Sequence, residues 1–239
     1  MRRALVLMLL VLVNAVVVGR SVAADPTAQA DAVLAWGKAV TGGPAWDALQ
    51  GWHEQGALHR RDAEPVEYEV WIDINHPAML SLATVGGHTR ADGFNGAETW
   101  RVDANGAQIG QDAKSLSDGW RSEYFGLYGF YFPDRFAAER TYVGARVAKG
   151  VTFDIVRVTP RGGTPMDLWF DRKSHMLSAL VDEDPTHPTV VTPADFRQTH
   201  GVLLPYAIVQ KTGGVVVIRT VSGYDFSPVS PSRFTPPDR

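Results

Sequence analysis

Hydrophobic and polar residues alternate most regularly between Glu67 and Ile74. All even positions of this stretch are apolar, and three of the four odd positions are acidic. A period of two predicts a half-buried strand, here with Tyr68, Val70 and Ile72 on its inner face. Shorter runs of this kind, separated by glycine-rich and Asn-Gly turns, recur over most of the chain. The pattern predicts a mainly β protein with helices (α+β), built on an antiparallel sheet of about ten strands.

Two segments have helical spacing instead. The first runs from Asp25 or Thr27 to about Val40, where the sequence TGGP at residues 41–44 ends it. In the second, Tyr124 to Phe132, aromatic and apolar residues recur at i, i+3, i+4, i+7 and i+8. An open sheet of about ten strands tends to curl or split rather than stay flat. We therefore expect a strongly curved sheet folded around the helices, with the helix at 124–132 against its concave side.

The first 24 residues have the layout of a secretory signal peptide. Arg2 and Arg3 precede an apolar run at residues 4–18, and small residues at 22–24 predict cleavage at Ala23 or Ala24. The alternative is an uncleaved anchor helix, which needs roughly 20 apolar residues, more than this run contains. We expect an exported, periplasmic protein.

Removal of residues 1–24 would take away three arginines and no acid. The 23 basic residues would fall to 20 against 26 acidic ones, a net charge of −6. This acidic balance, without basic clusters, disfavours nucleic acid and anionic lipid surfaces as partners. The chain has no cysteine, so its fold uses no disulfide. We expect one domain at residues 25–226, followed by an extended proline-rich tail at residues 227–239.

Recognisable catalytic and metal-binding motifs are missing from the sequence. The seven histidines have neither H-x-H nor H-E-x-x-H spacing, which favours exposed loop histidines over a metal site. G-x-S-x-G and Asp-Thr/Ser-Gly motifs are absent, and the glycine-rich turns join strand to strand. The sequence therefore predicts a protein that is not an enzyme and that uses no cofactor or metal. A hydrolase with an unrecognised site is the alternative.

Aromatic residues are numerous, with seven tryptophans in addition to the segment at 124–132. They either fill a solid core or leave a partly filled inner face that an apolar ligand completes. The second alternative defines candidate ligand-binding residues on the inner face of the strands and on the predicted helix. These are Tyr68, Val70, Ile72, Tyr124, Leu127, Tyr128, Phe132, Phe153, Ile155, Leu168 and Phe170.

Three short motifs follow one another along the chain in the order found in a known superfamily. The first, GFNGAETWRVDANG at residues 93–106, resembles a hallmark of bacterial outer-membrane lipoprotein-sorting proteins of the LolA/LolB lipoprotein-carrier superfamily. LWFD at 168–171 followed by a leucine at 177, and DFR at 195–197 followed by GVLLP at 201–205, resemble its later elements. The likeness covers roughly residues 45–226.

More narrowly, the chain is similar to the N-terminal half of exported proteins that continue into a retropepsin-like aspartic protease domain. The Asp-Thr-Gly triplet of that protease domain is absent here, so protease activity is not carried over.

The resemblance implies an incomplete β-barrel with helices as a lid over an apolar cavity. It also implies a periplasmic carrier-like protein that binds an acyl or lipid-like ligand, its partner being an apolar small molecule, a lipid or an acylated protein. A second function stays open, that of a non-enzymatic protein-interaction or scaffold domain of the cell envelope. In that alternative, exposed aromatic residues such as Trp71 contact a protein partner.

Overall fold

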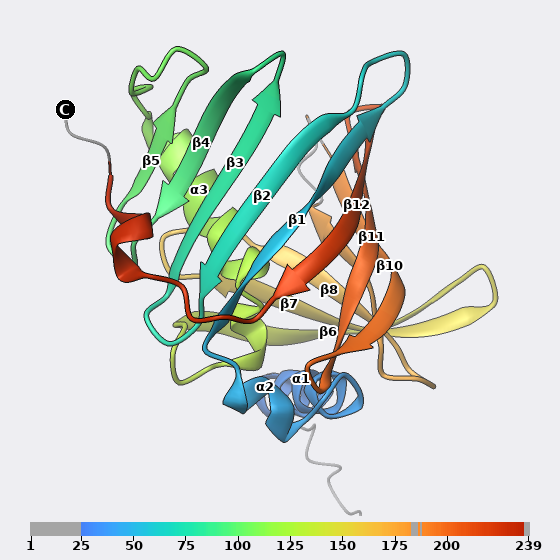
Figure 1. Ribbon diagram of the computed structural model, residues 1–239. Coiled ribbons are helices and arrows are strands. Elements are labelled where there is room, and N and C mark those ends of the chain that lie inside the picture. Colours follow the sequence, from blue (N-terminus) through green and yellow to red (C-terminus); the bar gives the residue numbers. More distant parts are fainter. Residues whose placement is uncertain (1–24, 183–185, 187, 237–239) are drawn as a thin grey trace, which may run out of the picture.

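The computed structural model describes residues 25–182, 186 and 188–236, so the predicted signal peptide lies outside the described residues (Figure 1). The described chain contains three α-helices, two 3-10 helices and twelve strands. In chain order they are α1 (Pro26–Val40), α2 (Pro44–Ala48), β1 (Gly51–Arg60), β2 (Val66–Asp73), β3 (Ala78–Val85), β4 (His88–Phe94), β5 (Thr99–Val102), α3 (Ala113–Gly126), η1 (Gly129–Tyr131), β6 (Ala138–Ala148), β7 (Val151–Pro160), β8 (Met166–Asp171), β9 (Leu177–Asp182), β10 (Thr189–Thr199), β11 (Val202–Thr212), β12 (Val215–Asp225) and η2 (Pro231–Phe234).

All strands belong to one antiparallel sheet, in the order β5-β4-β3-β2-β1-β12-β11-β10-β9-β8-β7-β6. The strongly curved antiparallel sheet predicted from the sequence is confirmed, but the predicted number of about ten strands is too low. Two strands carry weak hydrophobic patterns: β5 has only four residues, and β6 has no buried residue along its length. The sheet is open, and β5 and β6 form its two edges.

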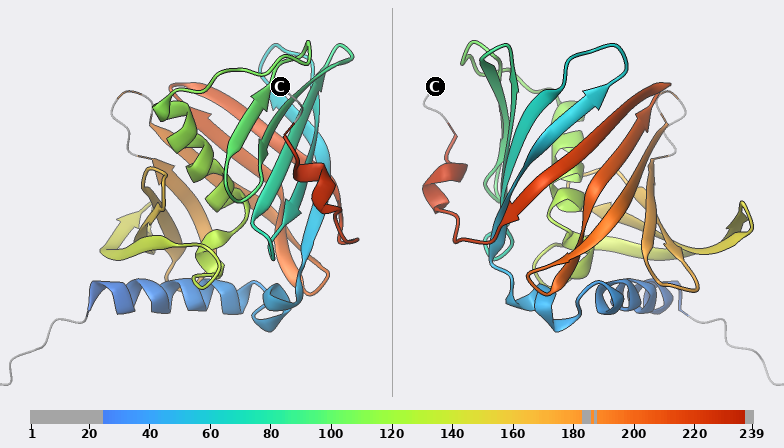
Figure 2. Two further views of the ribbon diagram at one scale, coloured as in Figure 1. Left: turned by 90° about the vertical axis from the view of Figure 1, so that its left-hand side faces the viewer. Right: turned by 45° about the vertical axis from the view of Figure 1, so that its right-hand side comes forward.

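Helices occupy the concave side and one end of the curved sheet (Figure 2). α3 runs along the concave side and contacts both β5 and β7, so it bridges the region between the two edges. α1 packs across β6 and β7 at one end of the half-barrel. The architecture is an incomplete barrel with helices packed against its inner side.

The first predicted helix is confirmed, and its local sequence explains its position. Asp25 is the N-cap, since its carboxylate accepts a hydrogen bond of 3.0 Å from the backbone N–H of Thr27. Pro26 then occupies the first turn, where its missing N–H costs nothing. Gly37 lies on the buried face of α1, and a Cβ at this position would be only 2.6 Å from the ring of Phe170. The glycine therefore lets the helix approach the sheet closely.

The predicted helix from Tyr124 to Phe132 is wrong. α3 begins at Ala113, capped by Asp112, and ends at Gly126, near the beginning of the predicted helix. Tyr128 has a left-handed backbone (φ 53°, ψ 34°), which ends helical geometry before the short 3-10 turn of η1. Gly126 also lowers helix stability by about 1 kcal/mol relative to alanine. A compact turn, rather than a helix, buries the aromatic side chains of this segment together.

A second, smaller hydrophobic cluster lies on the convex face of the sheet. Trp71, Ala78, Trp100 and Phe234 form its buried part. The sequence predicts an extended tail at 227–239; in the structure residues 231–234 form η2, and Phe234 is only 4% exposed. The tail therefore covers Trp71, which is 9% exposed, and the expectation of an exposed Trp71 is wrong.

Candidate ligand-binding site

The concave side of the sheet contains a cavity of about 520 Å³. Strands on both sides of the half-barrel, α3 and η1 contribute to its wall. Small-molecule sites in proteins have volumes in this range, roughly 300 to 1,000 Å³. Exposed lining residues mark its mouth, namely Arg60, Arg90, Ser122 and Gln210. On β1 the wall extends from Trp52 to Arg60, a length of roughly 25 Å at about 3.3 Å per residue.

Aromatic side chains form the floor of the cavity. The ring centroid of Trp46 lies 5.1 Å from that of Tyr128 and 5.3 Å from that of Tyr131. The indole N–H of Trp46 donates to the Thr41 hydroxyl at 3.0 Å, which fixes the indole in place. Burial raises the pKa of Tyr131 to about 12, so its hydroxyl stays neutral.

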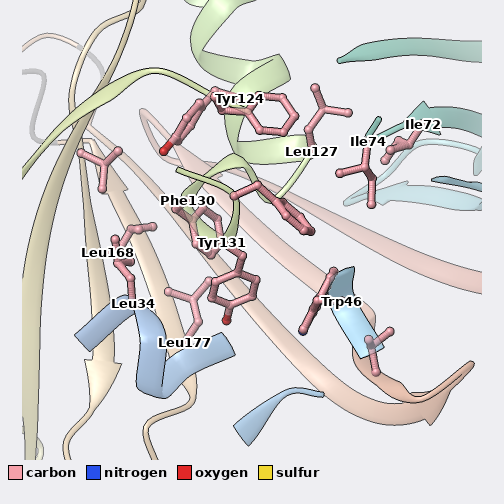
Figure 3. Close-up of a cluster of buried hydrophobic side chains, with 14 of the residues drawn as sticks. Leu34, Trp46, Ile72, Ile74, Tyr124, Leu127, Phe130, Tyr131, Leu168 and Leu177 are labelled. Atoms are coloured by element: carbon pink, nitrogen blue, oxygen red, sulfur yellow. The ribbon is translucent and has the colours of Figure 1, made fainter. Parts of the chain in front are cut away.

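Below and beside this floor the interior is solidly packed. Figure 3 shows side chains from α1, α2, β2, α3, η1, β8 and β9 converging on one cluster. Trp46, Leu127 and Leu168 have no solvent exposure, and Phe130 is 2% exposed. A packed core therefore supports the floor at one end, and the cavity opens above it.

Three polar side chains lie together inside the cavity, between these apolar walls: Glu54, Tyr68 and Arg219. The hydroxyl of Tyr68 donates a hydrogen bond of 2.6 Å to Oε1 of Glu54, and Nε of Arg219 lies 3.6 Å from the same oxygen. Glu54 is only 5% exposed. Burial, and to a lesser degree the nearby charge of Glu54, raise the pKa of Tyr68. The hydroxyl therefore stays protonated and can donate a hydrogen bond. For Arg219, burial works against the charge, but Glu54 and neighbouring tyrosines raise its pKa.

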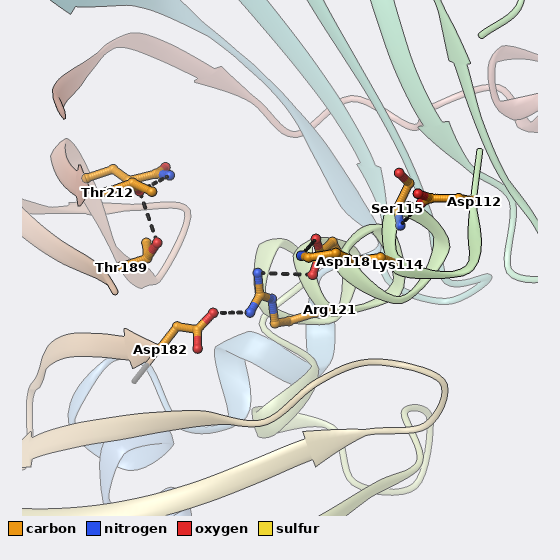
Figure 4. A network of polar contacts seen from close by, with 9 residues as sticks. Asp112, Lys114, Ser115, Asp118, Arg121, Asp182, Thr189 and Thr212 are labelled. Carbon is orange, nitrogen blue, oxygen red and sulfur yellow. Dashed lines mark hydrogen bonds and ion pairs between the residues drawn. The ribbon is translucent and has the colours of Figure 1, made fainter. Parts of the chain in front are cut away.

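An ion-pair network lies at the mouth of the cavity, between α3 and the end of β9 (Figure 4). Arg121 on α3 pairs with Asp182 on β9 and lies 3.5 Å from Asp118 one turn earlier on the helix. Asp118 also accepts a hydrogen bond of 2.7 Å from Lys114. Arg121 and Asp182 both line the cavity, so this pair joins its two sides.

The structure places four of the eleven predicted residues on the cavity wall: Tyr68, Val70, Ile72 and Tyr128. Five others belong to the packed core and do not line the cavity, namely Tyr124, Leu127, Phe132, Leu168 and Phe170. The structure thus brings together the residues from β2 and Tyr128, which lies between α3 and η1. Whether any of them binds a ligand stays a prediction.

Phe153 and Ile155 lie on the opposite face of the sheet from Leu168 and Phe170. Ile155 pairs directly with Trp169, whereas Phe170 pairs with Asp154 and Leu168 with Val156. Directly paired residues in an antiparallel sheet point to the same face. The expectation that all four share the inner face is therefore wrong. β7 has apolar residues on both faces, so alternation does not identify its inner side.

Sequence reasoning misses the charged residues of the cavity, and two of them, Glu54 and Arg219, lie together between its apolar walls. Both occupy inner-face positions of strands, Glu54 two residues after Trp52 and Arg219 two residues after Val217. The alternation of each strand would place these two residues on the inner face. A charged residue at such a position, however, interrupts the hydrophobic pattern and is not recognised as an inner-face residue. Their partnership across β1 and β12 appears only in three dimensions.

Within residues 25–182, 186 and 188–236, no three histidine, aspartate or glutamate side chains come together in a way that could hold a metal ion. In the same ranges, no helix is both long and apolar enough to cross a bilayer.

Comparison with solved structures identifies the architecture. A LolA superfamily protein from Nitrosomonas europaea superposes with a TM-score of 0.62 at 11% identity, covering 87% of this chain and 97% of the other. The fold is that of the LolA superfamily proteins. A putative outer membrane lipoprotein-sorting protein domain from Vibrio parahaemolyticus matches this LolA-like fold with the same TM-score and coverages, at 12% identity.

A third solved structure has the same LolA-like fold. It is a DUF1329 family protein from Desulfovibrio piger, with a TM-score of 0.61 and 13% identity over 88% of this chain and 98% of that one. No protein-family model matches the sequence, and no curated protein matches it significantly. The predicted resemblance in fold is confirmed. The narrower likeness to the N-terminal half of retropepsin-like proteins stays a prediction.

Proposed function

We propose that the protein is a carrier-like, non-enzymatic protein of the periplasm that holds an acyl or lipid-like ligand in the cavity of its half-barrel. The cavity of about 520 Å³, walled largely by aromatic and aliphatic side chains, supports this proposal most directly. The LolA-like fold agrees with it, since one protein of this fold is described as a putative outer membrane lipoprotein-sorting protein domain. The apolar partner would be a lipid, an acylated protein or a small apolar molecule.

The energetics of an apolar ligand are compatible with reversible carriage. Burial of about 300 Å² of hydrocarbon at roughly 25 cal/mol/Å² contributes about 7 kcal/mol before the costs of association. The net affinity would then be in the micromolar range or weaker, about 8 kcal/mol or less. A carrier must also release its ligand, so modest affinity fits the proposed role.

The sequence of residues 1–24 supports export, since it has the layout of a signal peptide. The alternative function, an interaction or scaffold domain, depends on an exposed aromatic patch. Trp71 motivates that alternative, but Phe234 packs in the same cluster and the Arg233 guanidinium lies 4.2 Å from the Trp71 ring. The carrier proposal therefore has the stronger structural support.

The test is ligand binding by the mature protein, measured with the neutral apolar fluorophore N-phenyl-1-naphthylamine and with native mass spectrometry of protein purified from its own envelope. Ser81→Phe places a ring inside the cavity, because Ser81 lines it. Thr84→Phe is the matched control on the same strand, since Thr84 faces outward and its hydroxyl lies 2.9 Å from that of Thr89.

We expect Ser81→Phe to weaken fluorophore binding at least about tenfold, equivalent to 1.4 kcal/mol, and Thr84→Phe to leave it unchanged. A wild-type protein that is ligand-free in native mass spectra and binds no fluorophore would contradict the proposal.

A further inference from the structure

Arg219 is a charged residue inside the cavity whose hydrogen-bonding capacity is unmet by the protein. A guanidinium has five N–H donors in a planar fork. Within the described part of the chain, none of these donors makes a hydrogen bond, and Nε is buried without a hydrogen-bond partner. Glu54 Oε1 lies 3.6 Å from Nε, which is too long for a hydrogen bond.

The position of Arg219 directs these donors toward the cavity. About 35% of its side chain is accessible, and Arg219 lines the cavity, so this accessible part faces the hollow. Tyr68 stacks below the guanidinium, with its ring centroid 5.7 Å away. The Glu54 charge and the ring of Tyr68 hold the guanidinium in one place without satisfying its N–H groups.

A buried donor without an acceptor costs free energy, and the cost is larger for a charged group. An acceptor from outside the chain, either solvent or a ligand, removes this cost. A purely hydrocarbon ligand would displace solvent and offer no acceptor, so it would leave the guanidinium unsatisfied. A ligand with an acceptor oxygen next to Arg219 would therefore bind more favourably than an alkane.

We infer that the ligand carries a neutral acyl carbonyl, and that Arg219 donates a hydrogen bond to this carbonyl oxygen inside the cavity. The inference rests on the proposed carrier function and specifies its ligand class. Tyr128 lines the same inner wall of the cavity. The charges of Glu54 and Arg219 act electrostatically on its hydroxyl.

Beside the Glu54–Arg219 pair, charge balance favours a carbonyl over a carboxylate. Glu54 already neutralises Arg219, so the pair has no net charge to offer an anion. A carboxylate would lose its hydration on entering the cavity and would be repelled by Glu54. A carbonyl oxygen is less costly to desolvate and still accepts a charge-assisted hydrogen bond from the guanidinium.

The test compares ligands that differ in one oxygen. Displacement of N-phenyl-1-naphthylamine is measured with 1-dodecanoylglycerol, its ether analogue 1-O-dodecylglycerol, dodecanoate, and an N-dodecanoyl dipeptide amide. We expect the wild-type protein to bind the ester about tenfold more tightly than the ether, equivalent to about 1.4 kcal/mol. A preference for either acyl compound over the ether supports the inference. Which of the two binds more tightly distinguishes a lipid ester from an acylated peptide.

The variant Arg219→Met removes the donors and keeps most of the side-chain length. It also leaves Glu54 without its counter-charge, so the double variant Glu54→Leu/Arg219→Met, in which neither charge remains, is measured in parallel. We expect the ester-to-ether ratio to fall to about one in both variants. Arg61→Gln, in the exposed turn after β1, makes the same change in charge outside the cavity and is expected to keep the ratio of the wild type.

The possible failures separate the two proposals. Equal binding of ester and ether by the wild-type protein, or tighter binding of dodecanoate than of the ester, overturns the inference while the carrier function stands. A ratio that persists in both Arg219 variants overturns it as well. If neither the fluorophore nor any of the four ligands binds, the carrier function itself is contradicted, and the inference with it.

Discussion

The hydroxyl of Tyr68 and the carboxylate of Glu54 are joined by a 2.6 Å hydrogen bond inside the cavity. Glu54 is 5% exposed, and Tyr68 is 4% exposed. A buried carboxylate needs hydrogen bonds, since each lost bond to a charged group costs about 1.5 to 3 kcal/mol. This contact therefore stabilises the fold as well as shaping the cavity wall.

We expect Tyr68→Phe to lower the free energy of unfolding by about 2 kcal/mol, because it removes the hydroxyl that solvates Glu54. Urea denaturation followed by circular dichroism measures this change. Tyr206→Phe is the matched control, because in the described part of the chain the Tyr206 hydroxyl makes no hydrogen bond. Its effect is expected to stay within about 0.5 kcal/mol. Equal effects of the two substitutions would contradict the stabilising role of the Tyr68 hydroxyl.

The close approach of α1 to the sheet depends on Gly37. We expect Gly37→Ala to destabilise the protein by about 1 kcal/mol or more, because the new methyl group would meet the Phe170 ring at 2.6 Å. Phe170 is 1% exposed, so its ring has little room to move. Without this clash, the substitution would stabilise the helix by about 1 kcal/mol, so even the sign of the change is informative.

A double-mutant cycle with Phe170→Leu provides the control for this prediction. Shortening the side chain of Phe170 makes room for the methyl group at position 37. The double variant is therefore expected to be about 1 kcal/mol more stable than the sum of the two single effects predicts. Additive effects, or a stabilising Gly37→Ala, would show that the helix does not depend on this contact.

Sequence patterns identified the elements in which one face is buried and the other is polar, because hydrophobic residues then recur with a simple period. β2 has one buried and one more polar face, so alternation placed Tyr68, Val70 and Ile72 correctly on the inner side. α1 has a capping residue and a glycine-containing end, and its position follows from these local signals. The curvature of the sheet follows from the number of strands.

The cavity could not be deduced in the same way, since it depends on contacts between distant segments. The spacing of aromatic residues after Tyr124 fits a helix, but a left-handed Tyr128 and the turn of η1 bury the same rings. The role of Arg219 depends on Glu54, which lies at the other end of the domain sequence. No local sequence pattern indicates that the side chains of Arg219 and Glu54 lie close together.

Glu123 predicts a pH dependence of stability. It lies on α3, is 5% exposed, and its Oε2 has no hydrogen-bond partner. Burial, and to a lesser degree the charge of Asp92, raise its pKa well above the usual value. The folded chain thus keeps the Glu123 proton to a higher pH than the unfolded chain does. Across this interval the folded state binds more protons, so the free energy of unfolding falls as pH rises.

Glu123→Gln replaces the titratable carboxyl group with a neutral amide. We expect the variant to gain stability relative to the wild type as pH rises above 4.5, the ordinary pKa of a glutamate, by at most about 1.4 kcal/mol per pH unit. Urea denaturation at several pH values measures the difference. Glu67→Gln, the same substitution at an exposed position of β2, is measured in parallel as the control for the change from Glu to Gln. A difference between Glu123→Gln and the wild type that stays constant with pH would mean that Glu123 ionises normally in the folded protein.

The C-terminal segment at residues 231–234 covers Trp71 on the convex face of the sheet. Phe234 anchors the C-terminal segment in the convex-face cluster with Trp71 and Trp100. We expect Phe234→Ala to destabilise this local contact by about 2 to 3 kcal/mol, less than the 3 to 5 kcal/mol for a phenylalanine in a large core. Arg233 would then lose its position over the Trp71 ring.

Limited trypsin digestion with mass spectrometry measures this release, because cleavage after Arg233 requires the segment to leave the sheet locally. We expect cleavage to be at least about tenfold faster in Phe234→Ala than in the wild type. Ser232→Ala, an exposed neighbour in the same 3-10 turn, is the control and should be cleaved at the wild-type rate. Since the cluster lies on the convex face, ligand binding in the cavity should be the same in both variants. Equal cleavage of both variants would mean that Phe234 does not hold the segment in place.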